Sequence, residues 1–227
     1  TGMNPFIGSV FVFTTLLIAI PSAVKAFNYI TTLWKGNIRF SPAMLFSIGL
    51  VSTFVTGGLT GIILADSALD VNVHDTYFVV AHFHIVMGMS AIFGMLAGVY
   101  HWFPKMFGRM MNNKLGFVHF WITIVAGYGV FFPMHFVGIA GAPRRYYEYS
   151  NFEFLNGVQD LQPIISTFAI IGAIGQLFFL FNFFYSIRYG QKAVQNPWKS
   201  NTLEWTTSVK HLHGNWDGPL PIVHRWA

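Results

Sequence analysis

The chain has no cysteine and few charged side chains. Cysteine is absent from its 227 residues, and Asp, Glu, Lys and Arg together make up only 9% of them. The missing cysteine excludes a disulfide framework, a zinc ribbon, iron–sulfur ligation and a thiol nucleophile, so any metal site must use histidine, carboxylate or methionine ligands. The net charge of +5 is scattered through short connections and forms no basic stripe. The sequence therefore predicts no nucleic-acid partner.

Apolar residues dominate what remains. Hydrophobic side chains make up 54% of the chain, and phenylalanine alone occurs 25 times, which is unusual for a soluble domain. Such a composition favours helices that present aliphatic and aromatic surface to lipid. The first residues, 1–5, lack the charged region and the small-residue cleavage site of a signal peptide. We expect the sequence to be a segment of a longer protein.

Five stretches are apolar over the roughly 20 residues that a membrane-spanning helix needs. Each break between them contains proline, glycine, asparagine or charge. The stretches cover approximately residues 10–33, 43–64, 77–103, 116–139 and 163–189. The sequence therefore predicts an all-α polytopic membrane protein over residues 1–190, followed by a polar tail over residues 191–227.

Lysine and arginine concentrate in alternate connections, which indicates that these connections and the tail face the cytoplasm or matrix. The opposite connections carry acidic residues and then the pair Arg144 and Arg145, on the side where the rule disfavours it. Guanidinium groups bind carboxylates and phosphates bidentately. Lipid head groups, Glu148 and the propionates of a buried haem are therefore candidate partners for the arginine pair.

The most informative segment is HDTYFVVAHFH at residues 74–84. His82 and His84 are two residues apart, so at about 100° per residue they point to opposite faces of a helix. They cannot bind one metal ion as a pair, because zinc ligands on a helix are spaced by four. Two histidines on opposite faces suggest one axial ligand for each of two cofactors, since a single imidazole commonly holds haem iron. Hydrogen bonding to neighbouring helices is the alternative, and the residues alone leave both open.

Two weaker polar sites lie on the first and third spans. His74 and Asp75 precede the third span and could bind a divalent ion with oxygen ligands from elsewhere, although a helix cap from Asp75 or Thr76 is equally plausible locally. Lys25 lies deep in the first span, three residues after Ser22. Its side chain either extends along the helix to the surface or belongs to a proton relay with the Ser22 hydroxyl.

The remaining histidines and the span glycines are interpreted structurally. Six histidines near span ends or in the tail are expected to be solvated or interfacial: His101, His119, His135, His211, His213 and His224. Glycines of the second and third spans are expected to serve close helix packing: Gly57, Gly58, Gly61, Gly88, Gly94 and Gly98.

These motifs together resemble subunit I of the cytochrome c oxidases, the catalytic subunit of haem–copper respiratory oxidases. The segment at residues 74–84 carries most of the likeness, with HWFP at residues 101–104 and PRRY at residues 143–146 after it. Residues 18–25, 37–42, 57–61 and 201–205 fit the same family in the same order. The likeness covers essentially the whole chain and corresponds to the last five of that subunit's twelve helices.

The resemblance implies a role for each matching residue. His82 would be the axial ligand of the high-spin haem, where oxygen is reduced, and His84 would ligate the low-spin haem. Phe83 would lie between the two haems. Lys25 and Ser22 would belong to a proton channel, with Ser22 at a position where the family commonly has threonine.

Further roles fall at the outer end of the spans. Arg144, Arg145 and Asp70 would lie in the haem propionate region. His74 and Asp75 would contribute to a magnesium site at the interface with subunit II. The family's copper ligands belong to earlier helices, so this segment alone is expected to be inactive.

The resemblance also implies an activity and partners. The intact subunit would reduce O2 to water with electrons from cytochrome c and pump protons, using two haems of type A, copper and magnesium. Its partners would be subunits II and III, cytochrome c or a fused cytochrome domain, and membrane lipid. The His74 and Asp75 pair favours this over a quinol oxidase, and a proton-coupled transporter or a cofactor-free membrane protein are alternatives from other classes. Ser22 and the tail favour a bacterial cytoplasmic membrane over the mitochondrial inner membrane.

Overall fold

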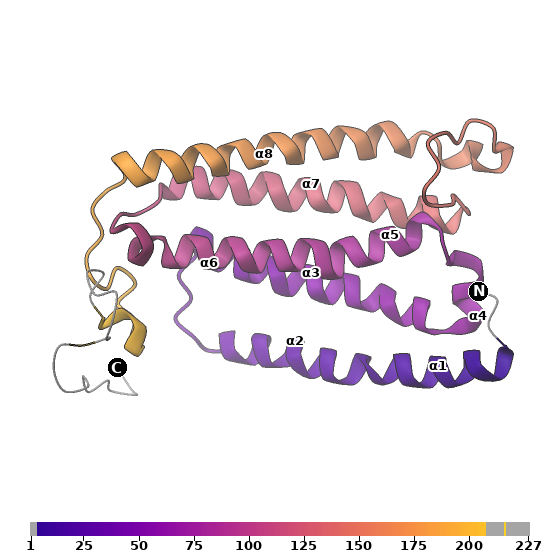
Figure 1. Cartoon of the computed structure of the whole chain (residues 1–227), viewed down its shortest axis with the longest axis horizontal. Helices are drawn as coiled ribbons and strands as arrows, with labels where there is room; N and C mark the ends of the chain where they lie inside the picture. The colour runs from indigo at the N-terminus through magenta and orange to yellow at the C-terminus, as the bar shows by residue number, and fades with distance from the viewer. Residues whose placement is uncertain (1–3, 208–215, 217–227) are drawn as a thin grey trace.

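The computed structural model describes residues 4–207 and residue 216. Its long helices run side by side, and each is connected to the next at one end of the bundle (Figure 1). The elements that make up the long helical segments are α1 (Pro5–Leu17), α2 (Ala19–Leu33), α3 (Pro42–Ala65), α5 (Tyr77–Phe83), the π-helix η1 (His84–Met89), α6 (Ser90–Phe107), α7 (Asn113–Ile139) and α8 (Leu161–Tyr189). The short ones are α4 (Ser67–Val73), η2 (Glu153–Val158) and η3 (Leu203–Trp205).

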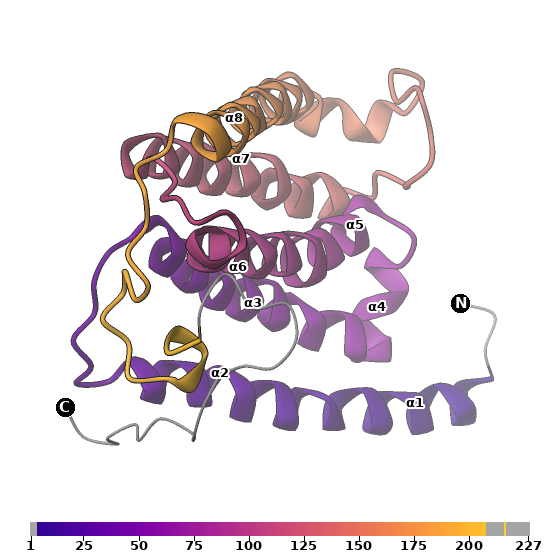
Figure 2. The same cartoon turned by 60° about the vertical axis from the view of Figure 1, so that its left-hand side comes forward.

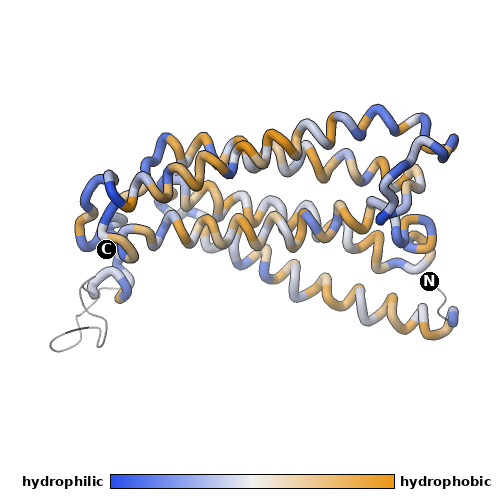
Figure 3. The backbone as a smooth tube through the Cα atoms, turned by 45° about the horizontal axis from the view of Figure 1, so that its top comes forward, coloured by the Kyte–Doolittle hydropathy of each residue, from blue (hydrophilic) through white to orange (hydrophobic). Residues whose placement is uncertain are grey.

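Within the described residues, five helical segments are long and apolar enough to cross a membrane, which confirms the predicted all-α polytopic fold. They are Pro5–Leu33, Pro42–Ala65, Tyr77–Phe107, Asn113–Ile139 and Leu161–Tyr189. The first begins five residues before the expected residue 10 because Asn4 caps it, accepting a hydrogen bond from the Phe6 amide at 2.9 Å, and Pro5 takes the first helical position. Hydropathic colouring shows apolar residues along the helices and polar residues at both ends of the bundle (Figure 3).

Local capping signals fix where the other helices begin and end. Ser41 caps α3 by accepting from the Met44 amide at 3.3 Å, and Pro42 follows at the first position. Asn112 caps α7 in the same way. Gly108 ends α6 in the left-handed conformation, with φ of 65°.

The rod formed by α1 and α2 is interrupted at Ile18. Pro21 has no amide hydrogen to donate to the carbonyl of Leu17, so one helical hydrogen bond is missing there. The Ser22 hydroxyl donates to the Ile18 carbonyl at 2.8 Å. The Ser22 hydroxyl thus lies at the interruption, in the middle of the rod.

The helices form a layered bundle in which α8, α7, α5 with α6, α3 and the α1–α2 rod follow one another from side to side (Figure 2). The core is aromatic and lies between α3, α6 and α7, where Phe46 contacts Phe93, Tyr100 and Phe120 at centroid distances of 5.2–5.6 Å. The apolar window of the rod is 0% buried within this chain. The rod is thus attached to the bundle along a seam and leaves most of its surface uncovered.

The first part of the tail packs against the chain itself. Main-chain hydrogen bonds join Met110 to Gln191 at 2.8 Å and Ala193 to Gly108 at 3.0 Å. Trp205 is 2% exposed and stands edge-on to His101. The tail as far as residue 207 is therefore ordered by the end of α6 and the α6–α7 connection. The predicted positions of His211, His213 and His224 lie outside the described residues.

Candidate metal-ligand site around His82 and His84

His82 and His84 lie on different sides of one continuous helix. His82, in the last turn of α5, contacts α3, where the Gly57 carbonyl is 2.9 Å from its Nδ1 atom. His84, the first residue of η1, lies against α7, where its ring stacks on Phe131 with centroids 4.9 Å apart. The spacing of two residues therefore has the geometric result that the sequence predicts.

The hydrogen bonds of His82 determine its tautomer. Its Nδ1 atom is 2.9 Å from the Gly57 carbonyl oxygen and 2.9 Å from the Thr60 hydroxyl. A carbonyl oxygen only accepts hydrogen bonds, so Nδ1 carries the proton and donates. The Nε2 atom then has a free lone pair, which is the form in which histidine binds a metal.

Glycines on α3 make room for the His82 ring. A Cβ atom added at Gly61 would lie 2.9 Å from Cε1 of His82, and one at Gly57 would lie 2.6 Å from the Val86 amide nitrogen. Both distances are shorter than side chains tolerate. The prediction that these glycines serve only helix packing is therefore incomplete, because Gly61 also leaves the space that the imidazole occupies.

His84 has the same arrangement on the opposite side. Its Nδ1 atom is 2.8 Å from the Val80 carbonyl, so this nitrogen donates and Nε2 is again free. The ring is held by the neighbouring Phe83, at a centroid distance of 4.4 Å, and by Phe131. Both imidazoles are thus oriented by a backbone carbonyl and present Nε2 outward from the helix.

A π-helical turn follows the two histidines. It widens the backbone over His84–Met89, and the Ser90 hydroxyl donates to the Ile85 carbonyl at 3.2 Å. Thr53, which is fully buried on α3, lies 2.9 Å from the same hydroxyl. Such turns are frequent at functional sites because they reposition side chains within a helix.

His82 lines a cavity in the seam between the α1–α2 rod and α3. This cavity has a volume of about 230 Å³ and is also lined by Ser22 and Gly61. It shares Ser22 and Gly58 with an apolar cavity of about 310 Å³ toward α2. On the other side it shares Thr15 with a cavity of about 600 Å³ that reaches Asp70. His82 therefore borders a groove with one polar end and one apolar end.

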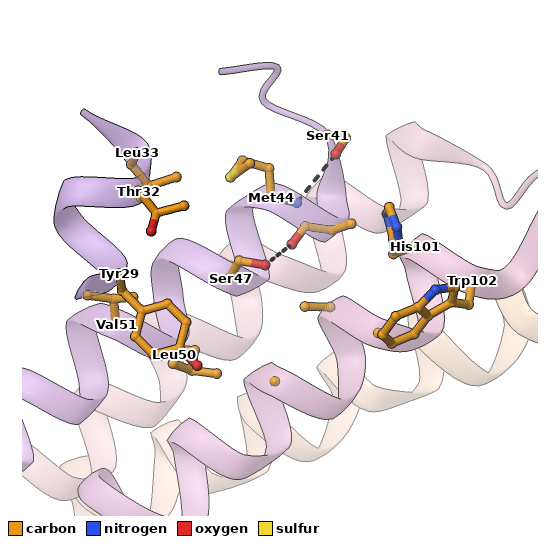
Figure 4. A pocket seen from close by; sticks show the side chains of 14 residues that line it. Tyr29, Thr32, Leu33, Ser41, Met44, Ser47, Leu50, Val51, His101 and Trp102 are labelled. Carbon is orange, nitrogen blue, oxygen red and sulfur yellow. Dashed lines mark hydrogen bonds between the residues drawn. The ribbon is translucent and has the colours of Figure 1, made fainter. Parts of the chain in front are cut away.

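A fourth cavity of about 450 Å³ lies between α2, α3 and α6, at the end of the seam predicted to face inward. Figure 4 shows Tyr29 on one side and His101 and Trp102 on the other. His101 stacks on Trp198 of the tail at 5.5 Å and lies 3.7 Å from Glu204. The tail therefore contacts the wall of this cavity.

At the end of the bundle predicted to face outward, the structure brings His74, Asp75 and Arg144 together. Asp75 forms an ion pair with Arg144, and its Oδ2 atom is 3.5 Å from Nε2 of His74. Asp70 lies 3.4 Å from Nδ1 of His74. The hydrogen bond from Arg144 holds the pKa of the Asp75 carboxyl below its ordinary value. Among the described residues no three His, Cys, Asp or Glu side chains form a metal-sized group, so a metal bound here needs further ligands.

The partner of Arg144 within the chain is Asp75 and not Glu148. The Glu148 carboxylate accepts from the amides of Tyr149 and Ser150 at 3.1 and 2.9 Å, which lowers its pKa. The Nε atom of Arg144 is buried and has no hydrogen-bond partner in the part of the chain described. Arg144 therefore has a donor available for another acceptor. Arg145 has a positive φ of 74°, which marks a tight turn at this point.

Lys25 and Ser22 have different neighbours. Ser22 lines the His82 cavity, whereas Lys25 is exposed on α2 with its Nζ atom 5.6 Å from the Tyr29 ring. The structure thus places only the hydroxyl of this pair beside His82.

The prediction of solvated histidines is wrong for two of the six. His119 is fully buried between the Tyr100 hydroxyl and Gln176, each at 3.2 Å. His135 is 8% exposed, and its Nδ1 atom is 3.0 Å from the Phe131 carbonyl. Both lie on α7, which is covered by α8 and α5, and this tertiary packing could not be read from a single span. Thr60 was also missed, because a threonine in an apolar helix gives no signal on its own.

Comparison with known proteins decides the family. The family model described as Cytochrome C and Quinol oxidase polypeptide I matches residues 1–178. The chain belongs to this family. The matched segment is the C-terminal part of such a subunit, as the resemblance predicts, and the protein is an integral membrane protein.

Relatives of this oxidase subunit family match along nearly the whole chain. It is 47% identical to the alternative cytochrome c oxidase subunit 1 of Bradyrhizobium diazoefficiens, over 100% of this chain and 39% of that relative. It is 45% identical to cytochrome c oxidase subunit 1 of Thermostichus vulcanus, over 98% of this chain and 39% of that relative. The chain therefore spans about two fifths of the length of these relatives.

A solved structure of a heme-copper terminal oxidase dimer has the same fold. The TM-score is 0.71 at 19% sequence identity, over 86% of this chain and 39% of that one. At this identity the likeness concerns the arrangement of helices alone.

Proposed function

We propose that this chain is the C-terminal part of the catalytic subunit of a terminal respiratory oxidase, which reduces O2 to water with electrons from cytochrome c and pumps protons. The observation that carries the proposal is the pair of imidazoles on opposite sides of one helix. Each has Nδ1 hydrogen-bonded to a backbone carbonyl, Gly57 for His82 and Val80 for His84, and each leaves Nε2 free. His119 uses both ring nitrogens within the bundle. His135 also leaves Nε2 without a partner among the described residues, so what distinguishes His82 and His84 is their placement on opposite sides of one helix.

In this proposal the Nε2 atom of His82 would hold the high-spin haem and that of His84 the low-spin haem, and Phe83 would lie between the two haems. Haem iron, when bound, supplies the electron transfer and the reduction of oxygen. The fit rests on the groove beside His82, whose apolar end suits the long tail of a haem of type A. The ligands of the copper ion lie outside this chain, so the segment alone is inactive.

The outer cluster completes the cofactor region. Arg144, through its unpartnered Nε, and Arg145 would hold haem propionates, and Asp70 would lie near them. His74 and Asp75 would supply two ligands to magnesium, with the rest from subunit II. Ser22 and Lys25 would belong to a proton channel, and the exposed Lys25 side chain would then be covered by the part of the subunit that precedes this chain.

The proposed partners are oxidase subunits II and III, cytochrome c or a fused cytochrome domain, and lipid. The bacterial origin of the two relatives supports a bacterial cytoplasmic membrane. A quinol oxidase of the same superfamily is the alternative for the electron donor. The His74 and Asp75 pair favours cytochrome c, and an assay of membranes with reduced cytochrome c against a quinol separates the two.

The experiment that tests the haem assignment is a reduced-minus-oxidised visible spectrum, with and without carbon monoxide, on membranes that contain the full-length subunit. His82→Ala is expected to abolish the carbon monoxide-sensitive component, and His84→Ala the low-spin component. His101→Ala, which affects a half-buried histidine at the inner end, is the control and should keep both. Unchanged spectra in the first two variants would contradict the oxidase proposal and favour a cofactor-free or transporter role.

A further inference from the structure

Thr60 contacts the inner nitrogen of the His82 ring. Its Oγ1 atom lies 2.9 Å from Nδ1 of His82 and 2.7 Å from the carbonyl oxygen of Gly57. The carbonyl can only accept, so the hydroxyl proton of Thr60 points to Gly57. A lone pair of the same oxygen is then left to accept from the imidazole Nδ1–H.

The Nδ1–H group thus has two acceptors. The Gly57 carbonyl is at 2.9 Å, the same distance as the Thr60 hydroxyl, and the two oxygens are themselves hydrogen-bonded. Two acceptors restrict rotation of the ring about its bond to Cβ more than one acceptor does. They also withdraw the proton more strongly, which makes Nε2 a better electron donor to a metal.

We propose that Thr60 is a positioning residue of the oxidase, which sets the orientation and the basicity of the His82 imidazole through a hydrogen bond to Nδ1. This rests on the proposed role of His82 as a haem ligand. Thr60 touches neither substrate nor cofactor in this role and acts only through the ring. Its place is fixed by Gly57 and Gly61, which allow α3 to approach α5 and η1 closely.

The same helix offers a matched control. Thr56 is one turn earlier on α3, and its hydroxyl donates to the Ser52 carbonyl at 2.8 Å. Its other hydrogen bond, at 3.1 Å, is to the hydroxyl of Tyr128 on α7. Thr56 therefore shares the residue type and the helix with Thr60 but makes no hydrogen bond to His82.

The test uses the purified full-length oxidase carrying Thr60→Val, Thr60→Ser or Thr56→Val. Resonance Raman spectra of the reduced enzyme report the iron–histidine stretching frequency, and redox titration reports the potential of the high-spin haem. Thr60→Val keeps the shape but removes one acceptor, so we expect the stretching frequency to fall and the potential to rise. Thr60→Ser and Thr56→Val should match the wild type.

Three results would overturn the proposal. One is an unchanged frequency and potential in Thr60→Val. Another is an equal shift in Thr60→Ser or Thr56→Val, which would point to packing. The third is a shift to higher frequency. This would mean that the Thr60 hydroxyl competes with the Nδ1–H group of His82 for the Gly57 carbonyl and so weakens the hydrogen bonding of the ring. Failure of the proposed function is distinct, because the wild type would then have no iron–histidine band and His82→Ala would keep its carbon monoxide response.

Discussion

Asp75 and Arg144 are joined twice, although they lie in different connections of the bundle. Their side chains form an ion pair, and the amide of Arg144 donates to the carbonyl of Asp75 at 2.9 Å. Asp75 has a positive φ of 56°, so its carbonyl and its carboxylate are both directed toward the opposing loop. This double connection gives Arg144 an anionic partner on the side where charge statistics disfavour an arginine.

The outer loop should be sensitive to acid because of this pair. The pKa of Asp75 is lowered chiefly by the hydrogen bond from Arg144, and that of Glu148 by the amide of Ser150. A lowered pKa contributes stability that is present above the unfolded value, about 4 for a carboxyl group, and is lost as the pH falls through the folded value. We expect the loop after Pro143 to loosen below about pH 4. Hydrogen exchange of this loop at several pH values, corrected for intrinsic rates, measures the effect.

Asp75→Asn should show faster exchange at the Arg144 amide already at neutral pH, and a flatter pH dependence. Glu153→Gln is the control, since Glu153 is an acidic residue on the same side and forms no ion pair among the residues described. Equal protection of Arg144 in wild type and Asp75→Asn would show that the main-chain bond alone holds the loop.

Gly61→Ala should disturb the His82 site without unfolding the helix. The new Cβ atom would lie 2.9 Å from Cε1 of His82, so the ring must tilt. We expect a reduced carbon monoxide-sensitive component in visible spectra of the full-length oxidase. A Cβ added at Gly58 meets no atom of the described residues within 4 Å, so a changed spectrum in Gly58→Ala would not come from a clash within them. A normal spectrum for Gly61→Ala would mean that the ring has more freedom than this geometry allows.

Asn182→Leu should destabilise the contact between α7 and α8. Asn182 is fully buried, accepts from the Asn112 amide and the Ser186 hydroxyl, and donates to the Asn112 carbonyl, each at 3.0 Å. Unsatisfied buried groups cost about 1–3 kcal/mol, so we expect a lower thermal midpoint in detergent. The exposed Asn151 provides the control, Asn151→Leu. Equal midpoints for the two variants would contradict a structural role for Asn182.

Trp205→Ala should release the tail from the end of α6. The Trp205 ring is buried against His101 and Trp198, and Lys105 lies 5.6 Å from its centre. Replacing a buried tryptophan by alanine costs about 3–5 kcal/mol. A loss of this size should be enough to detach the short tail segment from the bundle. We expect faster tryptic cleavage after Lys199. Leu203→Ala, at a side chain that is 48% exposed, should leave the rate unchanged.

The sequence was sufficient to predict the number of spans and the placement of His82 and His84 on opposite faces of the third span, because apolar length and helical spacing are local properties. It was insufficient wherever two helices meet. Nothing near His82 in the sequence indicates that Gly57 and Thr60, more than twenty residues away, would share its Nδ1 proton. The burial of His119 likewise depends on α8, whose Gln176 supplies its partner.

The π-helical turn has a consequence for the whole of α6. Such a turn adds one residue to the helix, so everything after Met89 is rotated by about 100° relative to an uninterrupted helix. Deleting one residue from the turn would leave His82 facing Gly57 but would turn Phe93 and Tyr100 away from Phe46. The extra residue therefore lets the two parts of one helix face different directions: the part before the turn orients the imidazoles, and the part after it packs the aromatic core.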